Sequence, residues 1–388
     1  MNAPLPNPPA QPPEGEGIDH VRGYRGQVAY IFGYDIAYDL ISEPAELLGQ
    51  SFGRFSVGSS KRAPREMLFY RPRMITLPPI ERTGPHGKVT LHRTVKLFPV
   101  GAISINVRVP FEVSDRDELV SYHELQFEAE SLHEHVQKLA DQIRRELEPC
   151  LKGPPAGGQL KNEEAYTVFC LESPLMTVGD RPLSAERWLL QRRREVAALL
   201  TQEANPDALS AQETLESTGL YLSYYESDLT VIDWDAAIVI DRSENFEEIL
   251  HVMELANVQL AELEAYDLIL DDSMERAYRD IAGGSQRTRR KRLPELREIR
   301  VDMARLSDEL SNTTKFFGDW HLSRIYKNLS SRFHLADWQN VVNEKLKTLD
   351  SLYQILKQDQ TNFWMMTLEL AIVLLFIIDL VVLVFTIH

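Results

Sequence analysis

The pattern of apolar and polar residues divides the chain into a mixed α and β part and a helical part. Apolar residues alternate at Ile103, Ile105, Val107 and Val109, which predicts a strand with one buried face. The same criteria predict strands over residues 27–32, 89–98, 102–109, 165–171, 220–225, 229–233 and 236–240. The strand pattern ends near residue 241. We therefore expect an α/β domain over residues 18–241 and helices beyond it.

Helical spacing within this domain suggests its topology. A helical stretch is predicted through Leu40 and Leu48, and apolar residues recur at helical intervals from Val136 to Leu147. Ser114 with Asp117 or Glu118 is the expected cap of that second, long helix. Taken with the strands, the order β-α-β-β-α-β is that of a ferredoxin-like domain. Two further helical stretches are predicted over residues 184–203 and 207–218.

Three long apolar seams follow residue 242, with residues spaced three and four apart. They run from Met253 to Ala277, from Leu296 to Trp320 and from Leu335 to Leu356. The polar residues Asp267, Thr313 and Lys345 interrupt them. Such seams pack helices into coiled-coil-like hairpins. The predicted fold class is therefore α+β, with a helical stalk over residues 242–362.

The last helix is predicted to cross a membrane once, over residues 363–387. Of these 25 residues, 17 are Leu, Ile, Val or Phe, which together contribute roughly −5 to −10 kcal/mol to insertion. Glu369 and Asp379 oppose insertion by up to about 3 kcal/mol each. Lysines precede the segment, at Lys345, Lys347 and Lys357, so the bulk of the chain is expected to be cytoplasmic. The expected location is the bacterial cytoplasmic (inner) membrane, with a single-pass tail anchor.

Composition narrows the classes of partner. The net charge of −16 and the pI near 5.2 argue against broad nucleic-acid binding. Cys150 and Cys170 are too few for a disulfide framework or a metal cage, and Cys170 is expected to be a small buried residue on a strand. Six prolines among residues 1–17 predict a disordered tail. No cofactor, metal site or catalytic residue set is expected.

Two groups of charged residues are candidate contact sites. One basic run is either a solvated loop or a contact for anionic lipid headgroups or RNA, and it comprises Arg287, Arg289, Arg290, Lys291 and Arg292. The predicted membrane helix contains Glu369 and Asp379 but no Lys or Arg. Each carboxyl group therefore needs a hydrogen-bond partner, and the same helix in a second copy of the chain is the simplest source.

Other polar and aromatic residues have a structural interpretation beside a functional one. Glu254, Asn257, Gln259 and Glu262 lie on an otherwise apolar helix. They either fix helix register through inter-helix hydrogen bonds or line a polar pocket against the 220–241 strands. Aromatic residues on strands usually belong to the core, which is the expectation for Tyr224, Tyr225 and Trp234. His133 and His135 are expected on a solvated, charged helix face.

The run Glu254-Leu-Ala-Asn257-Val-Gln259-Leu-Ala-Glu262-Leu, followed by Tyr266-Asp267 and Leu270-Asp271, resembles the signature helix of the required-for-meiotic-nuclear-division (YagE-like) family. Leu97-Phe98 with Gly101, Phe169-Cys170-Leu171, and Leu229–Trp234 with Ala237 and Asp241 are similar too. The resemblance covers residues 89–388. It implies a membrane-associated protein with a domain of uncharacterised biochemistry and no established catalytic residues. Mitochondrial members support translation at the inner membrane, and the missing transit peptide implies a bacterial member.

These features favour a non-catalytic, oligomeric, tail-anchored membrane scaffold that exposes its α/β domain to the cytoplasm. A link to translation or to membrane organisation follows from the resemblance. The expected partners are the membrane, further copies of the chain, and a protein partner or the ribosome. The alternative is a membrane-anchored enzyme that uses a pocket in the α/β domain. Crosslinking with identification of neighbours would separate these two classes.

Overall fold

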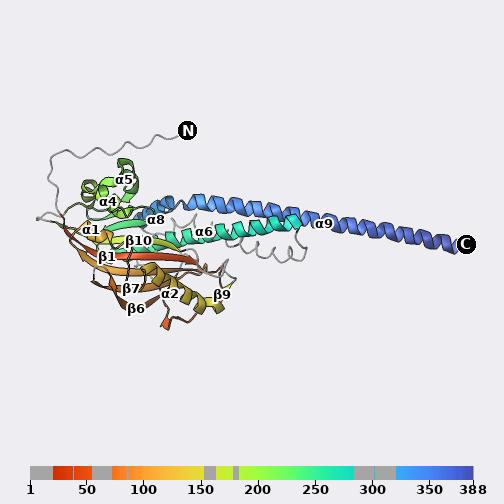
Figure 1. The fold of residues 1–388 in the computed structure, drawn as a ribbon, viewed down its shortest axis with the longest axis horizontal. Helices are drawn as coiled ribbons and strands as arrows, with labels where there is room; N and C mark the ends of the chain where they lie inside the picture. The colour runs from red at the N-terminus through yellow and green to blue at the C-terminus, as the bar shows by residue number, and fades with distance from the viewer. Residues whose placement is uncertain are drawn as a thin grey trace. The chain divides into compact units, whose positions relative to one another are not determined.

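The computed structural model describes residues 21–37, 39–54, 72–84, 87–152, 163–177, 183–283, 301 and 320–387 (Figure 1). The chain divides into two compact units. Unit 1 comprises residues 1–28, 110–123 and 169–246, and unit 2 comprises residues 29–109, 124–168 and 247–388. Three strands, β1, β8 and β10, contribute residues to both units.

The strands range from two to fifteen residues. In chain order they are β1 (Val21–Asp35), β2 (Asp39–Leu40), β3 (Glu46–Leu47), β4 (Gln50–Ser51), β5 (Gly53–Arg54), β6 (Arg73–Gly84), β7 (Gly87–Leu97), β8 (Ala102–Val113), β9 (Leu151–Lys152), β10 (Glu164–Glu172), β11 (Met176–Thr177), β12 (Tyr221–Leu222), β13 (Leu229–Ile232) and β14 (Ala236–Asp241). The described helices are α1 (Arg116–Val120), α2 (Leu132–Leu147), α3 (Ala185–Gln191), α4 (Arg193–Leu200), α5 (Ala211–Ser217), α6 (Phe246–Gly283), α8 (Trp320–Arg332) and α9 (Leu335–Ile387). The two longest described helices, α6 and α9, lie in the second half of the chain.

An antiparallel meander of β5, β6, β7 and β8 forms part of the sheet of unit 2, in which β8 also neighbours β1 and β1 neighbours β10. The predicted strands over residues 89–98 and 102–109 are confirmed as β7 and β8, and Gly101 in the turn between them has φ +88°. The sequence pattern missed β6, whose pairing with β7 shifts between Leu77 and Ile80. Pro78 and Pro79 lie at this shift. They have no backbone N–H to donate to the ladder, so the pairing shifts at this point. Two adjacent prolines also argue against a strand in the sequence pattern.

The ferredoxin-like order is not found, because the segment after β1 is not helical. Described residues there form the short strands β2 to β5. Pro44 and Gly49 interrupt the apolar pattern, and Leu48 and Gly49 adopt left-handed backbone angles (φ +54° and +68°) that no α-helix contains. The pairs β2–β9 and β3–β4 each form a separate two-stranded sheet.

The expected long helix after β8 is two helices with two caps. The second, α2, starts with a capping box in which Ser131 and Glu134 each accept a hydrogen bond from the other's backbone N–H. Its predicted apolar face, Val136 to Leu147, is buried in unit 2. Asp115, rather than Ser114, caps the short helix α1 in unit 1. The helical spacing was therefore correct and the starting residue was wrong.

Unit 1 contains the antiparallel strands β12, β13 and β14 with helices α3, α4 and α5. All four residues of β13 are buried, and Cys170 on β10 is completely buried, as predicted. The expectation that Tyr224, Tyr225 and Trp234 belong to the core was wrong. Their exposed fractions are 62%, 66% and 47%, because all three lie in the turns that flank β13 rather than on it.

Two long helices dominate the second half of unit 2. Figure 1 shows α6 and the first part of α9 side by side, and the two helices run in the same direction. The predicted seam of α6 is buried, from Met253 to Ala277, apart from the half-buried Met274. Leu255 and Val258 pack against Phe98 and Ala102 at the β7–β8 turn. The seam expected over residues 296–320 lies almost entirely outside the described residues.

The predicted membrane-spanning helix over residues 363–387 is not supported. Across the described parts of the chain, no helix combines the length and the apolar character that crossing a membrane requires. Thr367 and Glu369 add polar groups near the end of α9. The interpretation as a tail-anchored, single-pass protein of the inner membrane was therefore wrong.

Candidate functional site

Charged side chains from α6 meet polar side chains from β7 and β8 inside unit 2. We call this group the Lys96–Glu254 cluster, and it comprises Lys96, Ser104, Asn106, Arg108, Glu247, His251 and Glu254. Lys96, Ser104, Asn106 and Glu254 are each at most 1% exposed. A completely buried pair of opposite charges is rare, since burial removes each ion from water. This cluster is therefore the most unusual chemical feature of the described structure.

Backbone geometry places these side chains on facing surfaces. Lys96 on β7 lies directly opposite Ser104 on β8, and Asn106 and Arg108 follow on the same face of β8 because side chains two apart share a face. On α6 the members are Glu247, His251 and Glu254. Their spacing of four and three puts them on one side of the helix. The sequence therefore brings two complementary polar rows together once α6 covers the strands.

Glu254 is the centre of the hydrogen-bond network. Its carboxylate accepts a hydrogen bond from the Lys96 ammonium, from Ser104 Oγ at 3.1 Å and from Asn106 Nδ2 at 3.4 Å. Arg108 extends the network. Its Nε donates to Asn106 Oδ1 at 3.4 Å, and its Nη1 lies 2.6 Å from Glu247 Oε2. The two cations and two anions therefore balance, and each charge has an opposite charge within reach.

Contacts within the cluster also shift the pKa values of two of its members, His251 and Glu247. Burial, and then the positive charge of Lys96, hold the pKa of His251 well below its ordinary value, so this imidazole is neutral near pH 7. Its Nδ1 lies 4.0 Å from Glu254 Oε2. Burial raises the pKa of Glu247, but the hydrogen bond and charge of Arg108 outweigh it and the net pKa is lowered. Glu247 thus carries the negative charge that its partner Arg108 needs.

This arrangement fixes α6 on the sheet. A helix that slid by one residue along β7 and β8 would separate the buried charges, each of which costs several kcal/mol when unpaired. Close packing supports the same register. A Cβ atom added at Gly33 on β1 would approach Asn257 Nδ2 to 3.0 Å. The centre of the cluster, Lys96 and Glu254, is sealed from solvent, so what the pair does chemically is to hold one helix in one place.

The polar helix residues singled out in the sequence have these partners within unit 2. Glu254 belongs to the cluster. Asn257 Nδ2 donates to the backbone oxygen of Glu164 on β10 at 2.7 Å, and Gln259 Oε1 accepts from the hydroxyl of Tyr326 on α8 at 2.6 Å. Glu262 is 4% exposed. Gln259 thus makes an inter-helix hydrogen bond of the kind expected, whereas Glu254 and Asn257 bind strands.

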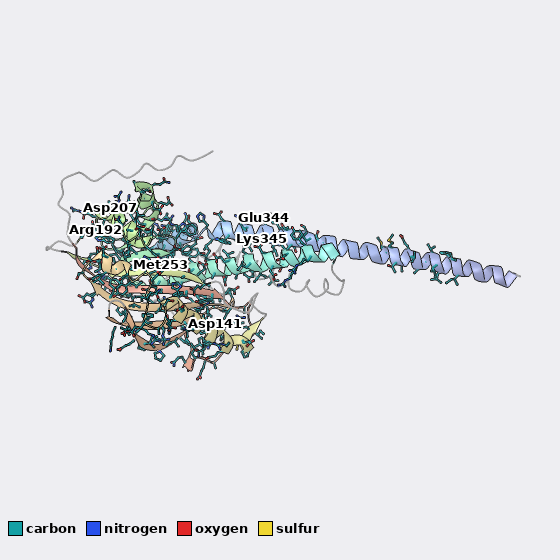
Figure 2. The ribbon with its side chains drawn as sticks, in the orientation of Figure 1. Asp141, Arg192, Asp207, Met253, Glu344 and Lys345 are labelled. Carbon is teal, nitrogen blue, oxygen red and sulfur yellow. The ribbon has the colours of Figure 1, made fainter. Side chains whose placement is uncertain are left out.

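A second ion-pair group joins α6 to α9. Lys345 Nζ lies 2.6 Å from Asp267 Oδ1 and 2.7 Å from Asp271 Oδ1. Lys345 lies on the side of α9 next to α6, beside the exposed Glu344 (Figure 2). Asp267 and Lys345 are the polar residues that interrupt two predicted apolar seams. Because each interruption falls where the helices meet, the two residues pair there instead of facing apolar groups.

Replacing Lys345 with Ala should lower the free energy of unfolding by about 1–3 kcal/mol, because the largely buried Asp267 and the exposed Asp271 then lose their shared cation. Lys347 on the same helix is a matched control. It is 72% exposed and, among the residues that the structure describes, pairs with the exposed Glu344 at 2.7 Å, so Lys347→Ala should change stability by less than about 0.5 kcal/mol. Urea unfolding followed by circular dichroism measures both. Equal effects of the two substitutions would contradict the pairing.

A third polar group in unit 2 is partly exposed. Glu163 accepts a hydrogen bond from the Tyr34 hydroxyl at 2.6 Å, and its other oxygen lies 2.7 Å from His133 Nδ1 on α2. The hydrogen bond to Glu163 raises the pKa of His133 despite partial burial. Burial raises the pKa of Glu163, but the hydrogen bonds from His133 and Tyr34 outweigh it and lower the net pKa. Burial and the Glu163 charge raise the pKa of Tyr34, which stays protonated.

This pair predicts a pH-dependent stability. The raised pKa of His133 adds stability below its ordinary value of 6.5 that is lost as pH rises through the folded pKa. The lowered pKa of Glu163 adds stability above its ordinary value of 4.5 that is lost as pH falls. The pair should therefore stabilise the fold most between these two values. His133→Gln should remove the loss above pH 6.5, whereas His92→Gln, at an exposed site on β7, should not. Unfolding midpoints measured across pH test the prediction. A pH dependence that His133→Gln leaves unchanged would contradict a role for the His133–Glu163 pair.

The described end of α9 exposes a continuous apolar surface. Eleven large apolar side chains are 47–72% exposed, namely Met365, Met366, Leu368, Leu370, Ile372, Val373, Leu374, Leu375, Phe376, Ile377 and Ile378. Glu369 lies among them and is also exposed. The side chain of Asp379, its expected companion, is outside the described residues. So is the whole basic run Arg287, Arg289, Arg290, Lys291 and Arg292, which stays a sequence-based prediction.

The sequence did not single out Lys96, Ser104, Asn106, Arg108, Glu247 or His251. A signal existed in β8, where Ser104, Asn106 and Arg108 alternate with the apolar positions. Alternation of this kind is typical of a strand with one face in water. A second signal was the row of Glu247, His251 and Glu254 on α6. Neither signal alone shows that the two polar rows lie against each other.

The fold and the cluster define the class of the protein: an α+β protein in which buried charge pairs fix a long helix on antiparallel strands. Comparison with known families gives its membership. Residues 25–247 match the family described as "Uncharacterized protein MJ0711, N-terminal domain". This match covers more than half of the chain, and the chain belongs to that family.

A curated relative carries the same name. "Uncharacterized protein MJ0711" of Methanocaldococcus jannaschii is 26% identical over 161 residues, which cover 41% of this chain and 50% of that protein. The matched part thus spans about half the length of the relative. No solved structure matches the chain.

The resemblance to the required-for-meiotic-nuclear-division (YagE-like) family was wrong. The matched family is that of MJ0711, and its match ends at residue 247. The motif that carried the resemblance, Glu254 to Glu262, follows that point. Leu and Ala with a few buried polar residues are what packing on a sheet requires of a helix, so such a motif is shared by unrelated proteins. The role in organellar translation implied by that resemblance is withdrawn with it.

Proposed function

We propose that this protein is a non-catalytic scaffold that assembles copies of itself through the apolar part of α9. The observation that carries the proposal is the exposed apolar surface from Met365 to Ile378. Fully burying one large apolar side chain contributes about 1.5–3 kcal/mol. Covering eleven half-exposed ones would therefore contribute on the order of 10 kcal/mol, enough to hold chains together after the entropy cost of association.

The sequence of α9 favours a second copy as the partner. The 3-4 repeat that begins at Leu335 continues in one register for six heptads, through Leu335, Trp338, Val342, Lys345, Leu349, Leu352, Leu356, Asp359, Phe363, Met366, Leu370, Val373 and Ile377. Lys345 and Asp359 are its only charged positions. A register kept this long is typical of helices that supercoil around identical helices.

The two ion-pair groups give such an assembly a defined geometry. The Lys96–Glu254 cluster fixes α6 on the strands of unit 2, and Lys345 fixes α9 on α6 through Asp267 and Asp271. An apolar helix joined to a folded unit by several ion pairs presents its surface in one orientation. Self-association would then set copies of unit 2 at a fixed spacing, which is what a scaffold requires.

Oligomeric state in solution tests this proposal. The full chain should be an oligomer by size-exclusion chromatography with light scattering. Replacing three seam residues, Leu370, Val373 and Ile377, with Gln should weaken association at least about tenfold, since each loses more than 1 kcal/mol of burial. The matched control replaces Leu368, Ile372 and Leu375 with Gln. These residues have a similar size, span the same length of helix with spacings of four and three, and lie outside the seam.

Two outcomes would overturn the proposal. A monomeric wild-type chain at micromolar concentration would remove the basis for a self-assembling scaffold. An oligomer that weakens equally in the seam variant and in the control variant would show that general hydrophobicity, rather than the heptad register, holds the copies together.

A further inference from the structure

A single ionisable side chain interrupts the apolar surface of α9. Figure 1 shows α9 continuing beyond the end of α6, and every described side chain from Met365 to Ile378 is exposed there. Eleven of these side chains are large and apolar, and Thr367 and Ala371 carry no charge. Glu369 is therefore the one charged group on the described part of this surface, which self-association would cover.

Glu369 lies beside the heptad seam of α9. It immediately precedes the seam residue Leu370, and Phe376 holds the same heptad position one repeat later. In a coiled coil, each seam side chain inserts between four residues of the facing helix. For Leu370 of a parallel copy, these are Met366, Glu369, Leu370 and Val373. The carboxyl group of Glu369 would therefore lie at the edge of the contact between two copies.

Within the described surface, the facing helix supplies no cation to this carboxyl group. In a parallel pair the residue across from Glu369 is Leu374 of the second copy. In an antiparallel pair that overlaps on this surface, the facing residues come from the same stretch, Met365 to Ile378, which contains no Lys, Arg or His. The second copy's own Glu369 is the one ionisable group there, and it has the same charge. In either orientation the ionised carboxylate would meet apolar side chains and no countercharge.

Covering Glu369 costs more free energy for the ionised group than for the neutral one. Taking an unpaired carboxylate out of water is expensive, whereas a protonated carboxyl group loses much less hydration. Association thus favours the protonated form, and each copy takes up a proton as its surface is covered. By linkage, a reaction that takes up protons becomes more favourable as pH falls. Self-association through α9 should therefore be stronger in acid than at neutral pH.

We propose that Glu369 makes the assembly of this protein depend on pH, so that copies associate through α9 as the carboxyl group takes up a proton and separate as it ionises. The inference rests on the self-association proposed above and adds its regulation. Where free chains are ionised and assembled chains are protonated, the association constant changes up to about tenfold per pH unit for each Glu369 that is covered. A glutamate in water ionises at about pH 4.3, so this change falls above that pH.

Sedimentation equilibrium of the full chain at about pH 7.5 and about pH 5.5 tests this regulation. The wild-type chain should associate at least about tenfold more tightly at the lower pH. Glu369→Gln keeps the size of the side chain but cannot ionise. This variant should associate at neutral pH about as tightly as the wild type does in acid, without pH dependence. Circular dichroism at both pH values confirms that each protein is folded.

Glu344→Gln is the matched control on the same helix. Glu344 is 72% exposed, pairs with Lys347 and lies outside the apolar surface, so this variant should keep the pH dependence of the wild type. Both variants remove one negative charge. A general loss of net charge in acid would therefore change the two variants alike, whereas a specific role of Glu369 separates them.

The results distinguish this regulation from the self-association on which it rests. Oligomers of the wild type and of Glu369→Gln that respond equally to pH, or not at all, would overturn the role of Glu369 and leave the α9 contact in place. Monomers at both pH values, for the wild type and for Glu369→Gln, would overturn the contact itself and the regulation with it.

Discussion

Replacing Glu254 with Leu is expected to lower the free energy of unfolding by about 3–5 kcal/mol, the largest effect predicted for a single substitution here. Glu254 is completely buried and accepts hydrogen bonds from Lys96, Ser104 and Asn106. Its loss leaves the Lys96 ammonium inside the sheet–helix layer without that countercharge. Urea unfolding monitored by circular dichroism measures the change.

A double substitution separates charge pairing from packing. Lys96→Met together with Glu254→Leu should recover most of the lost stability, because apolar residues of similar volume replace both ions. Lys88→Met is the control on the same strand. Lys88 is 79% exposed and lies 4.0 Å from Glu81, so its removal should cost less than about 0.5 kcal/mol. A double variant as unstable as the single one would show that the two charges are not coupled.

Gly26→Ala is expected to destabilise unit 1 by about 3 kcal/mol or more, since overpacking of a close contact forces the backbone to move. Gly26 lies on β1, and a Cβ atom there would be 1.8 Å from the backbone oxygen of Cys170 and 3.2 Å from the Cα of Leu171. Backbone atoms cannot rotate away as a flexible side chain can, so the strands themselves would have to separate.

Gly53→Ala is the matched control for this glycine. Gly53 also lies on a strand, β5, and the nearest atom to an added Cβ is Met74 O at 3.7 Å, an ordinary contact. This substitution should change stability by less than about 1 kcal/mol. Thermal unfolding of both variants decides between the two cases. A Gly26→Ala protein as stable as the wild type would mean that β1 and β10 are further apart than described.

The sequence pattern predicted the elements whose signals are local. Strands β7 and β8, with Gly101 between them, and β13 and β14 follow from alternation and turn residues. The buried seam of α6 follows from 3-4 spacing. Elements with conflicting local signals were missed. Pro78 and Pro79 concealed β6, and the apolar residues near Leu48 suggested a helix where a left-handed turn stands.

The sequence alone determined where polar residues interrupt apolar surfaces, but not what they meet. Asp267 and Lys345 were visible as interruptions, and Ser104, Asn106 and Arg108 as the polar face of a strand. Strand and helix periods follow from backbone geometry within a few residues, so they can be seen in any short window. Whether a polar face meets water or an opposite charge depends on distant residues.

Only the tertiary structure decided those partners. Lys96 and Glu254 are 158 residues apart, and they meet because α6 covers the polar face of β7 and β8. Tyr224 and Tyr225 are a second case. Their aromatic side chains suggest core positions, but the turn between β12 and β13 leaves both exposed. Local sequence determines the strand and helix periodicity of this protein and where its turns fall. Long-range packing determines which of its polar groups are buried, because burial is a property of the whole fold.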